Sequence, residues 1–272
     1  MSKRKSLYYA PCIVWLCCLL TACGGENPDD GSFNVFSPSD DITLGKSMRD
    51  EILNNPLEYE VWSRKEHAGA YALLDSVSGE ILQSGKLFYR DRFPWELYII
   101  HDDGTANAFC APGGYIFVYT GLMKYVYNTD ELAGVLAHEM AHADRRHSTD
   151  GLTRDYGISL LLRLIFGDDG SAVGELAGSL FSLNYSRSDE READEYGVAY
   201  LCETAFVSDA SKHFFERMAE ENGTAYVPPF LSTHPDDGTR VRTIEARAAE
   251  LQCPGRGHEK EDARLKALFL TD

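Results

Sequence analysis

The sequence predicts an α+β fold, in which a small β-sheet precedes a mostly helical region. Residues 81–120 contain short apolar segments separated by turn residues, whereas from about residue 128 onward the apolar residues recur at helical spacing. Strands and helices that are segregated along the chain in this way are typical of α+β domains. The 272 residues are enough for one domain with a sizeable core.

Residues 1–22 have the pattern of a lipoprotein signal peptide. Residues 3–5 are basic, and a short apolar run over residues 13–20 follows them. This run is too short to span a bilayer as a helix. It leads into Leu-Thr-Ala-Cys, which resembles the lipobox of bacterial lipoproteins, so we expect lipidation at Cys23. The alternative is an ordinary cleaved secretory peptide with an incidental cysteine.

We therefore expect a signal peptide over residues 1–22, a flexible tether over residues 23–40 and a single domain over residues 41–272. The tether is predicted from the abundance of Gly, Pro, Ser and Asp in that segment. A lipid at Cys23 would anchor the chain to a membrane. Because Gly24 rather than Asp follows the cysteine, we expect the outer membrane, with the domain facing the periplasm.

The first helix is predicted over residues 41–54, where apolar residues recur at helical spacing. Three strands are predicted next, over Leu87–Tyr89, Trp95–Ile100 and Tyr115–Tyr119. The Pro-Gly-Gly sequence at 112–114 is expected to turn the chain ahead of the last strand.

A long helix is predicted from about Asn128 to about His147. The Asn-Thr-Asp sequence at its start supplies N-cap candidates, and apolar residues line one side. The apolar segment Ile158–Phe166 is interpreted as core packing, with membrane contact or covering of the cleft as alternatives. Further helices are expected at 153–166, 173–183, 187–203, 207–221, 238–252 and 259–270.

The composition excludes some classes of partner and limits the disulfides. A formal net charge of −17 argues against nucleic-acid binding and against electrostatic attraction to anionic lipid. Once the signal peptide is removed and Cys23 is lipidated, the cysteines that remain are Cys110, Cys202 and Cys253. An exported compartment permits disulfides, and three thiols allow at most one internal pair. Cys202 with Cys253 is the pair that we expect.

The sequence His-Glu-Met-Ala-His at 138–142 carries the strongest chemical signal. Residues four apart share one face of a helix, so His138 and His142 can bind a single Zn²⁺ ion. Glu139 lies about 100° further around the helix, where its carboxylate can act as a general base. A purely structural zinc site has no use for that glutamate. The pattern therefore favours peptide hydrolysis by metal-activated water.

Residues 186–197 are the candidate source of the third ligand. Glu190 and Asp194 share one helix face, so Glu190 can bind zinc while Asp194 forms a hydrogen bond with a ligand histidine. Glu192 is expected to point well away from that face. By composition alone this segment is typical of a solvated charged helix, and only its pairing with the 138–142 motif favours metal binding. His147 is expected at a helix end, where it suits the helix dipole.

The chain resembles the M48 family of metallopeptidases over residues 41–252. The resemblance implies a zinc site with His138, His142 and Glu190 as ligands and Glu139 as the base. The segments that carry it are HEMAH at 138–142, SRSDEREAD at 186–194, STHP at 232–235, and a block with NAF at 107–109 and PGG at 112–114.

The family resemblance also implies roles for three further residues. His234 and Arg240 correspond to a pair that approaches the zinc and steadies the tetrahedral intermediate. In some relatives the histidine instead occupies the open position of the metal and keeps the enzyme latent, so His234 is also a candidate fourth ligand. Asn107 would lie beside the cleft and hold substrate backbone or the oxyanion, although an Asn in a turn often serves only the turn. The strand at 115–119 is expected to offer an edge to an extended substrate.

These features together predict a zinc endopeptidase that cleaves unfolded or misassembled envelope proteins. One alternative is a chaperone-like assembly lipoprotein that holds partners in the same cleft and cleaves rarely. Another is a cell-wall amidase, which the absence of a recognisable wall-binding module weakens. The sequence does not determine the natural substrate or the oligomeric state.

Overall fold

The computed structural model of the protein describes residues 36–166, 170–180, 183–222, 229–235 and 238–254, together with residues 25–26, 33–34, 265 and 268. The predicted signal peptide and Cys23 lie outside the described residues, as does most of the helix expected at 259–270. No helix in the described part of the chain is long and apolar enough to cross a membrane.

The main sheet has the strand order β3-β5-β4, with β3 at Glu96–Ile100, β4 at Ala108–Ala111 and β5 at Tyr115–Tyr119. β3 runs parallel to β5, whereas β4 is antiparallel to it. The Pro-Gly-Gly turn connects β4 to β5, and both of its glycines have positive φ angles (77° and 87°), which glycine adopts at little cost. A second pair of very short strands, Gly25–Glu26 (β1) and Phe33–Asn34 (β2), precedes the domain.

This strand order corrects one expectation. β5, the strand at 115–119, has hydrogen-bonded neighbours on both sides and therefore offers no edge to a substrate. The outer strand on that side of the sheet is β4, which the sequence did not predict as a strand.

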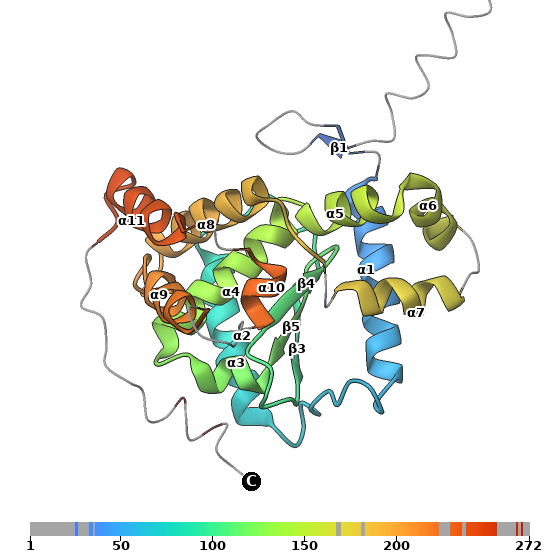
Figure 1. Ribbon diagram of the computed structural model, residues 1–272, viewed down its shortest axis with the longest axis horizontal. Coiled ribbons are helices and arrows are strands. Elements are labelled where there is room, and N and C mark those ends of the chain that lie inside the picture. The colour runs from blue at the N-terminus through green and yellow to red at the C-terminus, as the bar shows by residue number, and fades with distance from the viewer. Residues whose placement is uncertain are drawn as a thin grey trace, which may run out of the picture.

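Helices cover both faces of the main sheet, as Figure 1 shows with the sheet seen nearly edge-on. Side chains that alternate along β4 and β5 enter two separate hydrophobic cores, so both strands are apolar throughout. The helices are α1 (Pro38–Asn54), α2 (Ala68–Gln83), α3 (Thr120–Tyr125), α4 (Thr129–Asp144), α5 (His147–Tyr156), α6 (Ile158–Phe166), α7 (Gly170–Ser179), α8 (Arg187–Cys202), α9 (Ser211–Asn222), α10 (Pro229–Thr233) and α11 (Arg240–Glu250).

Strands β3 and β5 and most of the predicted helices are confirmed, but the predicted strand Leu87–Tyr89 is wrong. These residues form a turn. The backbone N–H groups of Phe88 and Tyr89 donate to the carboxylate of Asp144 at 2.9 and 2.7 Å, so a side chain takes the donors that a strand would use. Helices α2 and α3 were not predicted.

Two predicted helix boundaries are wrong because the backbone takes a left-handed turn. The helix expected to reach His147 ends at Asp144, since Arg146 has a φ angle of 65°, and His147 begins α5 instead. The helix expected at 153–166 is divided at Gly157, whose φ angle is 80°. In α6 beyond it, Leu161 is buried in the core, while Ile158 remains partly exposed.

Helix α1 begins at Pro38, three residues ahead of the predicted start at 41, because Ser37 caps it. The Ser37 side chain accepts from Asp40 N at 3.2 Å, and the Asp40 carboxylate accepts from Ser37 N at 2.7 Å, which together form a capping box.

A buried ion pair joins α1 to the turn after α4. Arg146 donates through Nε to Asp41 at 2.6 Å and through Nη2 to the carbonyl of Phe36 at 2.5 Å. Thr149 donates to the same carboxylate at 2.8 Å. Both members of the pair are almost fully buried, and burial raises the pKa of Asp41 in opposition to Arg146, which lowers it. The left-handed turn at Arg146 is thus held from α1.

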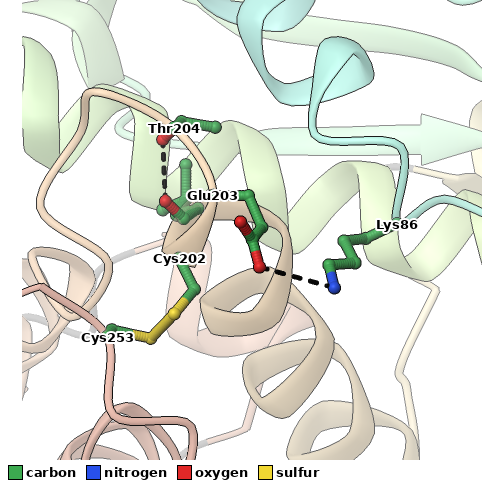
Figure 2. Close-up of a disulfide and its surroundings, with 6 residues drawn as sticks. Lys86, Cys202, Glu203, Thr204 and Cys253 are labelled. Atoms are coloured by element: carbon green, nitrogen blue, oxygen red, sulfur yellow. Dashed lines mark hydrogen bonds and ion pairs between the residues drawn. A yellow bond between two sulfur atoms is a disulfide. The ribbon is translucent and has the colours of Figure 1, made fainter.

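A disulfide joins the C-terminal ends of α8 and α11. Cys202 is bonded to Cys253, with their Cα atoms 5.1 Å apart, and Figure 2 shows the bond beside the ion pair of Lys86 with Glu203. Cys110 is the free thiol of the described residues and is buried. The bond holds together the two helices whose N-terminal halves face the site described below.

We expect Asp41→Ala and Arg146→Ala each to lower the free energy of unfolding by about 3–5 kcal/mol, because each leaves an uncompensated buried charge. Urea denaturation of the two single variants and of the double variant Asp41→Ala/Arg146→Ala measures this. The double variant should lose clearly less than the sum of the single losses. Strict additivity would show that the two charges do not depend on each other.

Candidate metal centre

Helix α4 presents two histidines on one face. Its N-cap is Asn128, whose side chain accepts from Glu131 N at 2.9 Å. Every residue of α4 from Glu131 to Asp144 is buried. Since His138 and His142 are four apart, their Nε2 atoms lie 3.0 Å from each other.

Helix α8 brings a carboxylate to the same point. A capping box of Ser186 with Asp189 starts the helix, and α8 packs along α4. Glu190 places Oε2 3.4 Å from His138 Nε2 and Oε1 3.4 Å from His142 Nε2. The third predicted ligand therefore meets the first two.

His234, just after α10, completes the cluster. Its Nδ1 lies 3.1 Å from Glu190 Oε1 and 3.3 Å from His138 Nε2. Its ring stacks on Phe230 with centroids 4.3 Å apart, and its backbone N–H donates to the Phe230 carbonyl at 2.8 Å. Thus α10 and its aromatic side chain hold the imidazole in place.

The four side chains fit a divalent cation. One ligand atom from each of His138, His142, Glu190 and His234 lies within 4.8 Å of all the others, and all four residues are buried. Imidazole nitrogens and carboxylate oxygens that converge at such short separations can share one cation. Nitrogen and carboxylate ligands in this number are typical of zinc.

Glu139 lies beside the cluster but outside it. Its side chain is fully buried, and within the described residues neither carboxylate oxygen has a hydrogen-bond partner. Among its neighbours is the ring of His234, whose Nε2 lies 3.4 Å from Glu139 Oε1. Burial raises the pKa of Glu139, against the opposing effect of His234 and His138.

Asp194 and Arg240 lie behind His138. Asp194 Oδ1 is 2.9 Å from His138 Nδ1, and Arg240 donates to both Asp194 oxygens at 2.8 and 2.6 Å. Burial raises the pKa of Asp194, but Arg240 outweighs it and the pKa is lowered. Arg240 also reaches Glu190 Oε2 at 3.0 Å and packs over the Phe215 ring. The guanidinium thus clamps the two carboxylates of α8.

The pKa values of the two histidines on α4 are shifted in opposite directions. Burial and Arg240 lower the pKa of His138, but its hydrogen bonds to Asp194 and Glu190 raise it to about 9. Burial lowers the pKa of His142 well below its ordinary value. In the absence of metal, the proton of this pair therefore resides on His138.

Two residues that sequence reasoning set aside lie behind His142. His147 Nδ1 is 2.9 Å from His142 Nδ1, and His147 Nε2 is 3.1 Å from Glu192 Oε2. The expectation that His147 ends the helix of the 138–142 motif is wrong, because the turn at Arg146 makes His147 the first residue of α5. Glu192 lies off the helix face of Glu190 and Asp194, as expected, and its side chain contacts His147. No local pattern signals this contact, because residues five apart do not share one face of a helix.

Asn107 is buried at the start of β4, and its side chain is engaged. Its Oδ1 accepts from Ala108 N at 2.9 Å and from Thr233 Oγ1 at 3.4 Å. Asn107 therefore touches the segment that carries His234. A contact of Asn107 with substrate remains a prediction, and so does a contact of Arg240 with a reaction intermediate.

We expect metal binding to release about one proton per site near pH 7, because His138 must lose the proton that its raised pKa retains. Below pH 9 the proton competes with the metal, so the affinity falls as the pH falls, by about tenfold per unit. Calorimetric titration with Zn²⁺ in buffers of different ionisation enthalpy counts the protons. Asp194→Asn should release fewer. Release of no proton by the wild type would contradict the assignment.

Comparisons with known proteins agree with this geometry. A profile of Peptidase family M48 matches residues 70–248, which include both helices of the cluster and His234. The chain is 38% identical over 167 residues to the mitochondrial metalloendopeptidase OMA1 of Schizosaccharomyces pombe, an alignment that covers 58% of this chain and 48% of the relative.

Bacterial and human proteins are also similar. The chain is 34% identical over 171 residues to a putative beta-barrel assembly-enhancing protease of Vibrio cholerae, covering 58% of this chain and 35% of that protein. It is 28% identical over 228 residues to the human mitochondrial metalloendopeptidase OMA1, covering 75% and 43%. The chain thus spans less than half the length of these curated relatives. With the profile matching most of the domain, the chain belongs to peptidase family M48, a family of metallopeptidases.

Proposed function

We propose that this protein is a zinc-dependent endopeptidase that cleaves unfolded or misassembled envelope proteins. The observation that carries the proposal is the position of Glu139. A fully buried carboxylate with no hydrogen-bond partner among the described residues is costly to the fold, and it lies next to a cluster able to bind metal. Such a carboxylate is expected where a base acts on water.

His138, His142 and Glu190 would hold the zinc ion. When bound, zinc supplies Lewis acidity, which lowers the pKa of water and polarises the scissile carbonyl. The chain's own part is to orient the ligands. Asp194 accepts from His138 Nδ1, so the Nε2 atom of His138 is directed toward the cluster. Arg240 contacts both Asp194 and Glu190 and so holds the two carboxylates in place.

Glu139 would move the proton. As the attacking water adds to the peptide carbonyl, the Glu139 carboxylate accepts a proton from that water. It then delivers the proton to the leaving nitrogen. Burial raises the pKa of Glu139 above that of an ordinary glutamate, which brings its basicity closer to the working pH.

We infer that His234 closes the site. Its imidazole is fully buried, 3.1 Å from Glu190 and 3.4 Å from Glu139, and so lies where a substrate carbonyl beside Glu139 would have to enter. This supports a latent form in which His234 is the fourth ligand. The same observation favours the alternative function, a chaperone-like lipoprotein that holds partners and cleaves rarely.

An extended substrate would add beside β4. Tyr119 N donates to Asn107 O at 3.1 Å, so the backbone groups of Ala108 and Cys110 face away from β5. Two of these groups are already bonded to side chains, Ala108 N to Asn107 and Cys110 O to the Ser148 hydroxyl. A peptide that displaced α10 would meet this edge next to Glu139. The enzyme would then recognise the peptide through its backbone more than through its side chains.

The location remains part of the proposal. The lipobox-like sequence at Cys23 supports an exported lipoprotein anchored to a membrane, and the Gly that follows it supports the outer membrane facing the periplasm. One relative is named for assembly of beta-barrel proteins and another for mitochondria, so the relatives together do not name one compartment.

We expect Glu139→Gln to lower the rate of casein cleavage by about 10²–10⁴-fold while zinc content stays at one per chain, because the amide cannot accept the proton. Activity and metal content are measured on the same preparations. The exposed Glu66→Gln is the matched control and should equal the wild type. Removal of zinc by a chelator should abolish cleavage by the wild type and by Glu66→Gln.

Equal activity of wild type, Glu139→Gln and chelated protein would reject the endopeptidase. Retained binding of unfolded protein in that case would favour the holding function.

We expect His234→Ala to increase the kcat for an unfolded substrate, because it removes the side chain that fills the site. Zinc stoichiometry should stay at one, since three ligands remain. Steady-state cleavage of a quenched fluorescent peptide measures it. A loss of kcat with zinc retained would instead assign His234 to stabilisation of the intermediate.

A further inference from the structure

A chain of contacts leads away from the cluster behind His142. His142 Nδ1 meets His147 Nδ1 at 2.9 Å, His147 Nε2 meets Glu192 Oε2 at 3.1 Å, and Arg145 Nε donates to Glu192 Oε1 at 2.7 Å. Both histidines are buried, whereas Glu192 is about one third exposed. None of the steps proposed above uses His147, Glu192 or Arg145.

The chemistry of the groups orders the protons along this chain. An ionised carboxylate only accepts hydrogen bonds, so His147 must carry its proton on Nε2 and donate to Glu192. In the neutral ring, His147 Nδ1 is then an acceptor. The contact at 2.9 Å therefore requires His142 to donate from Nδ1, which leaves the lone pair of its Nε2 directed at the cluster.

The backbone holds this arrangement in place. Arg146 takes a left-handed conformation with a φ angle of 65°, which is unfavourable for a residue with a side chain. That turn begins α5 with His147 and lets its ring face back toward His142. The ion pair of Arg146 with Asp41 holds the turn, and Arg145 packs over the Tyr196 ring.

Helix α8 thus supports both metal-facing histidines with its own carboxylates. Asp194 acts directly on His138 and is clamped by Arg240. Glu192 acts on His142 through an intervening histidine and is clamped by Arg145. The second arm needs an intermediary because Glu192 faces α5 rather than α4.

We propose that His147 and Glu192 are positioning residues, which hold His142 in the tautomer and ring orientation that bind the metal. The inference rests on the proposed metal centre and deepens it. Without His147, the His142 ring can carry its proton on Nε2, which removes a ligand atom. Loss of such an outer contact lowers metal affinity by about 10- to 100-fold.

The test measures the Zn²⁺ affinity of the full chain by competition with a chelating dye, together with the absorption spectrum of the Co²⁺-substituted protein. We expect His147→Leu to weaken zinc binding by about 10- to 100-fold. His147→Asn should restore most of the affinity, because the amide oxygen can occupy the place of Nδ1 and accept from His142. Glu192→Ala should give a smaller loss than His147→Leu, and the Co²⁺ spectrum should broaden in both.

The matched control is Thr153→Val. It lies on α5, is half-buried, and loses a hydrogen bond to the backbone carbonyl of Thr149 without touching the cluster or the ion pair of Arg146 with Asp41. It should bind zinc as the wild type does. Equal zinc affinity of His147→Leu and wild type would overturn the proposal, and so would equal losses in His147→Leu and His147→Asn, or a matching loss in Thr153→Val.

The outcomes separate this inference from the proposed function. A wild type that binds zinc and shows the expected affinity series, yet cleaves no protein, would sustain the positioning role and reject the endopeptidase. If the wild type cleaves casein but His147→Leu binds zinc with unchanged affinity, the endopeptidase is sustained and the positioning role is rejected.

Discussion

The packing of α8 along α4 is the interaction on which the rest of this structure depends. It places the carboxylates of Glu190 and Asp194 against His138 inside the protein, where charged groups are costly unless they are paired. Each is paired here, and Arg240 neutralises both carboxylates from α11. Glu139 is a departure from this pattern, because neither of its carboxylate oxygens has a hydrogen-bond partner in the described residues. Such departures are expected at functional sites.

Elements distant in sequence hold the cluster residues in orientation without contributing ligands to the cluster. The disulfide between Cys202 and Cys253 joins the far ends of α8 and α11, so the helix that carries Arg240 is held at both ends. On the other side, the pair of Arg146 with Asp41 holds the turn from which His147 starts. A disulfide and a buried ion pair outside the site thus help to hold the elements that orient its histidines.

His234 reaches the cluster because two side chains anchor α10. Phe230 stacks on the His234 ring, and Thr233 contacts Asn107, the residue before β4. In the proposed latent form, displacement of α10 would open the metal position and the edge of β4 together.

The sequence by itself determined the fold class and the helical faces of the site. The four-residue spacings of His138 with His142 and of Glu190 with Asp194 depend only on local helix geometry, and they came out as predicted. Only the tertiary structure decided which strand lies at the edge of the sheet, that Leu87–Tyr89 is a turn, and that His147 contacts His142. These features depend on contacts between segments far apart in the chain, such as a carboxylate that takes backbone donors or a left-handed turn held by an ion pair, and no local pattern encodes them.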